Sequence, residues 1–198
     1  VPRDAKHGTL RLTDADNPRD GRWYSPMLPG ARVRLEVQVP PGKREFLRLA
    51  LERVAHAYRD PFAPQAQAKS GSCNIDVICP QGDPWRDQID SVARYTFQST
   101  GGTFFCTGQL LATGNAAADL ASPRFSTAHH CVSTASEAQS MVFYWGYESS
   151  TCRTPGGAAS GTPIGVGANT RATQSGATLL ATHEATDFTA VQLTSSIP

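Results

Sequence analysis

The pattern of apolar and polar positions changes near residue 70. Beyond that point, short apolar runs alternate with clusters of Gly, Ser, Thr, Asn and Pro. Frequent short strands separated by turns are typical of β-barrels and β-sandwiches. The pattern therefore predicts an all-β domain. Its expected strands lie in the runs Ala93–Gln98, Thr103–Thr113, Arg124–Cys131, Met141–Tyr147, Ala177–His183 and Asp187–Leu193.

The part of the chain before residue 70 also contains strand-like patterns. Arg32–Val39 alternates strictly between polar and apolar residues and is bounded by Pro-Gly sequences, which predicts a strand between turns. Arg44–Arg59 has both an alternating pattern and a helical stripe, and we favour the strand. Residues 1–59 are therefore expected to form a β-rich segment.

Only one segment of the second part is expected to be helical. In the sequence GDPWRDQIDSVARY, Trp85, Ile89 and Val92 share one helical face. Asp83 precedes them as an N-cap and Pro84 occupies the first helical position. The Gly- and Ala-rich run from Thr154 to Thr170 is expected to be a long surface loop.

Length and composition exclude several classes of protein. The chain has 198 residues, 39% of them hydrophobic, and a net charge of +1. It is too hydrophobic for a disordered chain, and no apolar run approaches the roughly 18 residues that cross a bilayer. Near-neutral charge gives no footprint for nucleic acid. We expect no membrane or nucleic-acid partner, and any signal peptide would lie outside a sequence that opens with Val1.

Charge is distributed unevenly along the chain. Residues 1–69 carry 13 basic and 8 acidic side chains, whereas residues 71–198 carry 5 and 9. The two parts therefore have net charges of +5 and −4. They could attract each other as a prosegment attracts its enzyme, or they could be neighbouring domains with unrelated surfaces.

All five cysteines lie after residue 70: Cys73, Cys79, Cys106, Cys131 and Cys152. None are separated by the two residues typical of zinc knuckles and thioredoxin-type redox sites. Disulfides in an exported protein are the favoured interpretation. Because five is an odd number, one thiol is either reactive or paired with a cysteine outside this sequence.

Candidate chemistry centres on the sequence Thr-Ala-His-His-Cys, residues 127–131. A histidine beside a disulfide cysteine is a candidate general base, provided that a carboxylate orients its ring. Asp187 is the favoured orienting group because it begins an apolar strand, and Glu184 is its competitor. A metal site formed by His129, His130 and a reduced Cys131 is an alternative to this interpretation.

A second cluster with possible ligands lies in the sequence LTDADNPRDG near the N-terminus. Its side-chain oxygens could bind calcium, although their spacing is not that of an EF-hand. An Asp/Asn/Gly turn explains the same residues. The oxygen donors are Asp14, Asp16, Asn17 and Asp20.

Four separated motifs resemble those of the bacterial lysyl endopeptidases, a group of chymotrypsin-fold serine proteases. They are GSCNIDVICP (71–80), TAHHC (127–131), YWGYESSTC (144–152) and DFT (187–189). The resemblance implies the first β-barrel of a trypsin-like double barrel, with His130 as general base and Asp187 as its orienting carboxylate. It also implies disulfides Cys106–Cys131 and Cys79–Cys152, with Cys73 paired further along the chain, and no metal or other cofactor.

The resemblance also implies an organisation of the precursor. Residues 1–59 would be a propeptide, residues 60–72 a linker with a processing site near Lys69, and residues 73–198 the first barrel. The expected activity is that of a secreted serine endopeptidase acting on proteins or peptides, with its own propeptide as a partner. Lys specificity agrees with the absence of lysine from residues 71–198, although the whole chain has only three lysines.

The nucleophilic serine expected of such an enzyme is missing from this sequence. Ser195 and Ser196 closely follow Asp187 and lack the flanking glycines of a nucleophile turn. We therefore expect these 198 residues alone to be inactive. The alternative is a binding module that keeps the barrel without catalysis.

Overall fold

The computed structural model describes residues 10–13, 21–28, 32–56, 72–157 and 172–197. Within them the protein is mostly β. The helical elements are η2 (Arg44–Phe46), η3 (Pro80–Trp85), α1 (Arg86–Asp90), α2 (Ala116–Ala121), α3 (Ala135–Gln139) and η4 (Glu184–Thr186). The strands are β1 (Val92–Ser99), β2 (Gly102–Leu111), β3 (Arg124–Thr127), β4 (Val142–Trp145), β5 (Ala172–Ser175), β6 (Ala177–His183) and β7 (Phe188–Leu193).

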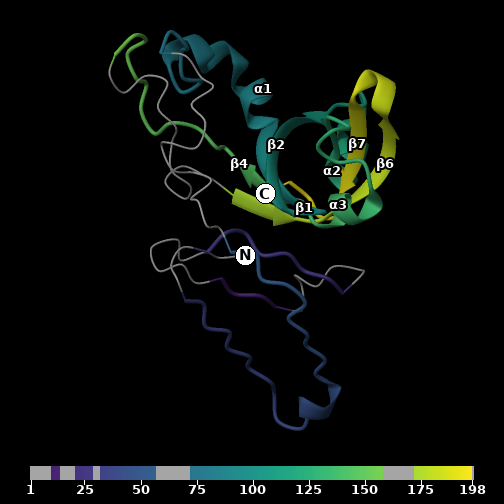
Figure 1. Ribbon diagram of the computed structural model, residues 1–198. Helices are drawn as coiled ribbons and strands as arrows, with labels where there is room; N and C mark the ends of the chain where they lie inside the picture. The colour runs from purple at the N-terminus through teal and green to yellow at the C-terminus, as the bar shows by residue number, and fades with distance from the viewer. Residues whose placement is uncertain (1–9, 14–20, 29–31, 57–71, 158–171, 198) are drawn as a thin grey trace.

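The seven strands form one antiparallel sheet in the order β5-β4-β1-β2-β3-β7-β6. The two edge strands, β5 and β6, are joined by Gly176 alone, whose φ of +83° is in the region that glycine adopts without strain. The chain therefore bends at Gly176 from one edge of the sheet to the other, and the sheet curls into a barrel (Figure 1). The all-β prediction is confirmed, and the architecture is consistent with a trypsin-like barrel.

The interior of the barrel is aromatic. Alternate residues of adjacent strands point inward because side chains alternate along a strand. The rings of Phe125 and Phe143 meet edge to face with centroids 5.0 Å apart, and Tyr95 and Trp145 pack around them. These four side chains are at most 5% exposed, so they anchor the strands on which the candidate site is built.

The residues just before η3 are attached to the loop that follows β4. Cys79 forms a disulfide with Cys152. Beside it, the backbone and guanidinium N–H groups of Arg153 donate to the carboxylate of Asp76, and this lowers the pKa of Asp76. These contacts hold residues 76–79 against residues 152–153, which follow β4.

Two expected strands in the N-terminal part are not formed. Arg32–Val39 is irregular, and within Arg44–Arg59 the described residues contain only the short 3₁₀ helix η2. The apolar face of the first run is exposed, with Val33 67% and Leu35 66% accessible. Alternation favours a strand only when a neighbouring strand and a core are present, and the described residues offer neither to this segment. Residues 57–59 lie outside the described residues.

The expected helix is present but shorter than its sequence pattern. It begins as the 3₁₀ helix η3, and α1 has only five residues. Asp83 does not cap it; its carboxylate accepts a hydrogen bond from Arg86 instead. Val92 already belongs to β1, and Trp85 is 59% exposed, so the apolar stripe is not a helical face against the core.

Other elements of the fold were not expected from the sequence. These are the short helices α2 and α3 and the strand β5. All helices among the described residues fall short of the length and hydrophobicity needed to span a membrane. Most of the proposed surface loop, residues 158–170, lies outside the described residues.

Candidate active site

The pairing of β3 with β7 places His130 beside Asp187. The two strands are antiparallel, with Thr127 opposite Thr189. The end of β3 therefore lies next to the start of β7. His130 lies three residues after β3, in a turn in which the Cys131 amide donates to the Ala128 carbonyl, and Asp187 immediately precedes β7.

Asp187 contacts His130 through both of its carboxylate oxygens. The backbone N–H of His130 donates to Oδ1 at 2.9 Å, and the ring Nδ1 lies 2.7 Å from Oδ2. Because an ionised carboxylate only accepts, the ring proton is on Nδ1. The other nitrogen, Nε2, is then free to accept a proton from a nucleophile. The His130 side chain is 70% exposed, so its ring is accessible.

The local backbone and electrostatics favour a charged Asp187. The hydrogen bond from the His130 backbone and that from its side chain lower the pKa of Asp187 below its usual range. Asp187 has a φ of +48°, a left-handed conformation rare for residues other than glycine. Asp187 follows the last residue of η4, and its amide donates to the carbonyl of Glu184, the first residue of η4. Glu184 thus contributes a backbone acceptor to the turn, and Asp187 rather than Glu184 is the carboxylate on His130.

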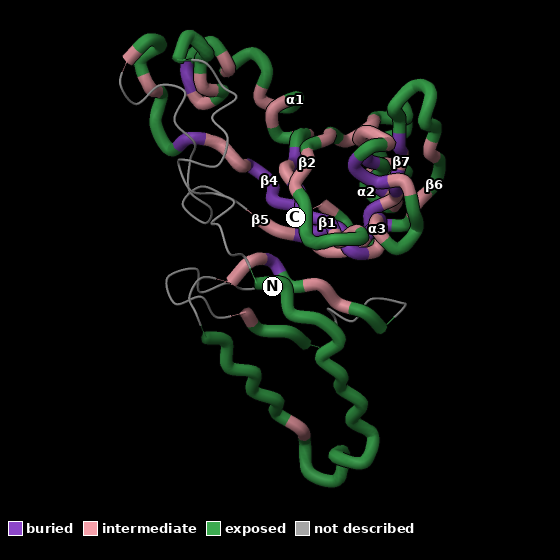
Figure 2. The backbone as a smooth tube through the Cα atoms, in the orientation of Figure 1, coloured by how far each residue is buried: buried purple, intermediate pink, exposed green. Residues whose placement is uncertain are grey.

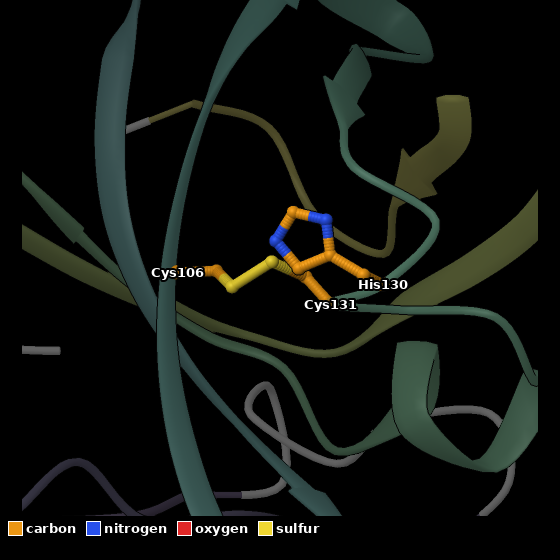
Figure 3. A group of neighbouring side chains, drawn as sticks. All are labelled: Cys106, His130 and Cys131. Atoms are coloured by element: carbon orange, nitrogen blue, oxygen red, sulfur yellow. A yellow bond between two sulfur atoms is a disulfide. The ribbon is translucent and has the colours of Figure 1, made fainter. Parts of the chain in front are cut away.

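A disulfide holds the turn that carries His130. Cys106 in β2 is bonded to Cys131, the residue after His130, and Figure 3 shows the imidazole beside the two sulfurs. This pairing, like Cys79–Cys152, is the one that the resemblance implies. Cys73 is exposed and forms no disulfide with any described residue.

The alternative metal site does not fit this arrangement. One ring nitrogen of His130 and the Sγ atoms of Cys106 and Cys131 lie within 4.8 Å of one another, but both sulfurs are oxidised in one disulfide. A cysteine binds zinc as a thiolate, and a sulfur in a disulfide is not one. His129 turns instead toward Thr182. The acidic turn considered for calcium, residues 14–20, lies outside the described residues, as does Lys69.

A second group of polar residues, not expected from the sequence, forms hydrogen bonds to the turn that carries His130. The hydroxyl of Thr189 donates to the Val132 carbonyl at 2.7 Å. Thr182 lies 2.6 Å from Thr189, and His129 Nδ1 lies 2.8 Å from Thr182. Since the carbonyl can only accept, each hydroxyl donates onward and His129 Nδ1 carries a proton. This chain of bonds ties both sides of His130 to β6 and β7.

The serines near the end of the sequence are far from this site. Ser195 lies eight residues beyond Asp187, beyond the far end of β7, where its carbonyl and hydroxyl accept hydrogen bonds from Gln174. At about 3.3 Å per residue, an extended strand separates Ser195 from Asp187 by roughly 25 Å. Ser195 is therefore too far away to give its hydroxyl proton to His130.

A shallow hollow of about 390 Å³ opens beside the pair. Its lining includes Asp187 and Phe188 together with Thr107, Gly108 and Ser126 from the neighbouring strands β2 and β3. The exposed imidazole and this hollow lie at the same end of the barrel.

Comparison with known proteins identifies the family. Residues 67–198 match the family model described as the lysyl endopeptidase C-terminal domain. The chain belongs to this family. It is 30% identical over 150 residues to the lysyl endopeptidase of Pseudomonas aeruginosa strain PAO1, an alignment that covers 66% of this chain. The chain spans only 29% of the length of that relative.

Proposed function

We propose that this lysyl endopeptidase homologue is part of a secreted serine endopeptidase in which His130 is the general base and Asp187 orients it. The observation that carries this proposal is the contact of 2.7 Å between His130 Nδ1 and Asp187 Oδ2 at the exposed end of the barrel. Family membership supports a protease. The His–Asp geometry supports acyl transfer through a serine that lies outside residues 1–198.

The proposed chemistry follows from the proton positions. Asp187 holds the Nδ1–H tautomer, so Nε2 takes the proton of a serine hydroxyl as that oxygen attacks the peptide carbonyl. The imidazolium that forms is stabilised by the carboxylate, and it returns the proton to the leaving amine. No metal or other cofactor enters these steps.

The propeptide assignment is part of the same proposal. Residues 1–59 would be the propeptide and residues 60–72 the linker, with processing near Lys69. Preference for lysine in substrates is supported by the name of the family and by the absence of lysine after residue 69. Proteins and peptides are the proposed substrates.

The proposal is tested in the complete precursor. The coding sequence beyond Pro198 should contain a Gly-flanked serine and a cysteine to pair with Cys73. His130→Ala and Asp187→Asn should each lower kcat for a lysyl peptide substrate by about 10⁴-fold, as loss of triad members does in serine proteases. Glu184→Gln is the matched control and should leave kcat within about twofold.

Clear outcomes would overturn the assignment. A stop codon directly after Pro198 would leave the pair without a nucleophile and favour the binding module. Full activity in His130→Ala would remove the proposed base. A preference for arginyl or neutral substrates over lysyl ones would overturn the specificity alone.

A further inference from the structure

The outer face of β4 is covered by a segment from the start of the chain. All four residues of β4 are buried, although only Phe143 and Trp145 face the aromatic interior. Val142 and Tyr144 point to the other side and form a second apolar cluster. Tyr24 and Met27 pack against this cluster. Phe105 and Tyr147 pack against the same cluster. The burial of the outer face of β4 therefore depends in part on residues more than a hundred positions earlier.

Specific hydrogen bonds fix this contact. The Met27 backbone N–H donates to the hydroxyl of Tyr144 at 3.1 Å. The hydroxyl of Ser175, on the neighbouring strand β5, donates to the Tyr24 carbonyl at 2.7 Å. Pro26, between the two contacts, is buried, whereas Ser25 is exposed. We call residues 23–28 the docking segment.

Residues 32–56, the described residues that follow the docking segment, contribute little to the attachment. Residues 32–56 are exposed almost throughout, as the green tube in Figure 2 shows, while the docking segment is coloured mainly intermediate or buried. The described hydrogen bond from residues 32–56 to the barrel joins the exposed side chains of Arg53 and Gln98 at 3.3 Å. The attachment is thus concentrated in a few residues.

We propose that the docking segment binds the outer face of β4 as a separable ligand, and that it stays bound after the chain is cut between the N-terminal part and the barrel. This rests on the proposed function for its biological meaning, since a propeptide is cut from its enzyme. The opposite net charges of the two parts, +5 and −4, favour the association.

The position of the contact defines what the bound segment does. Along the sheet, β1 and β2 separate β4 from β3, which leads to His130. His130 is 70% exposed with the docking segment in place. The docking segment therefore covers an apolar face and leaves His130 and Asp187 accessible. This contact attaches the N-terminal part to the barrel without blocking the site.

The distribution of lysines allows a direct test on the full chain. A lysine-specific protease has sites only at Lys6, Lys43 and Lys69, so it leaves residues 70–198 uncut. It releases fragment 7–43, which contains the docking segment, and fragment 44–69, which does not. After digestion, native size-exclusion chromatography with mass spectrometry should find fragment 7–43 with the barrel and fragment 44–69 separate from it.

A matched pair of variants tests the docking segment itself. Pro26→Asp places a charge in the buried position and should release fragment 7–43. Ser25→Asp adds the same charge at the exposed neighbouring position and should leave fragment 7–43 bound. Release of fragment 7–43 from the wild-type digest, or equal retention in both variants, overturns the proposal.

Hydrogen exchange on the uncut chain gives a second measurement. The Met27 amide should be protected. Tyr144→Phe removes the hydroxyl that accepts its hydrogen bond, so exchange of this amide should become about fivefold faster, which corresponds to roughly 1 kcal/mol. An unprotected Met27 amide in the wild type contradicts the contact. Neither measurement needs peptidase activity, so failure of the endopeptidase proposal and failure of this one give different results.

Discussion

At the scale of single residues, the contact between Asp187 and His130 makes the stability of the protein depend on the protonation of Asp187. Its pKa is lowered by hydrogen bonds from the backbone and ring of His130. A folded-state pKa below the unfolded value means that the carboxylate stabilises the folded protein. The stabilisation is complete above the unfolded pKa, about 3.9, and is lost as the pH falls through the lower folded value.

This predicts the pH dependence of an Asp187→Asn variant. Its free energy of unfolding should be below that of the wild type at pH 5, and the difference should shrink steadily as the pH falls from 4 to 2. Urea unfolding at a series of pH values measures it. Glu184→Gln removes a nearby carboxylate without this contact, and a pH-dependent difference of the same size in that variant would contradict the prediction.

The bonds from His129 to Thr189 make a second residue-scale prediction. Thr182→Val keeps the shape of the side chain but breaks the link to His129, so it should cost about 1 kcal/mol of unfolding free energy. It should also weaken the NMR signal of the His130 Nδ1 proton, because the turn loses a support. Thr178→Val, at an exposed position of the same strand, is the control, and an equal effect there would contradict the prediction.

At the scale of elements, Gly108 shows why β2 and β3 approach so closely. A Cβ at this position would lie 2.2 Å from the Ser126 carbonyl oxygen and 2.4 Å from the Phe125 ring. Gly108→Ala should therefore lower the free energy of unfolding by about 3 kcal/mol, measured by chemical denaturation. Gln109→Ala, the next position of the strand, should cost less than about 1 kcal/mol. Equal costs for the two substitutions would show that the strands move apart.

The elements also show what the sequence could predict. The expected strand Ala177–His183 formed with its predicted bounds, and the expected strand Asp187–Leu193 formed from Phe188 onward. Arg32–Val39 has equally clear alternation but lacks a partner strand among the described residues, and that information is not local. Helix α3 did carry a local signal, a capping box between Thr134 and Glu137.

The same distinction applies to the site. His130 and Asp187 were found because short motifs mark them, and pairing of β3 with β7 brings them together across 57 positions. Thr182 lies in no recognised motif, Thr189 lies in the DFT motif only as a neighbour of Asp187, and threonine is common throughout the chain. Their roles depend on which strands become neighbours, so residue type and spacing could not indicate them.

At the scale of the whole molecule, the two disulfides close loops of different length and hold different parts. Cys79–Cys152 spans 73 positions and Cys106–Cys131 spans 25. In the chain-entropy model they contribute about 4.5 and about 3.5 kcal/mol. Replacing both members of a pair by serine should therefore lower the free energy of unfolding about 1 kcal/mol more for the Cys79–Cys152 pair.

The site should respond in the opposite order. Loss of Cys106–Cys131 frees the turn beside His130, so the NMR signal of the His130 Nδ1 proton should broaden or vanish at a temperature where the protein is still folded. Loss of Cys79–Cys152 leaves the turn tied and should preserve the signal. Cys73→Ser, at the exposed free thiol, is the control for both measurements. Chain entropy ranks the two disulfides by loop length alone. If removing Cys106–Cys131 lowers the free energy of unfolding more than removing Cys79–Cys152, native contacts of the shorter loop outweigh its closure entropy.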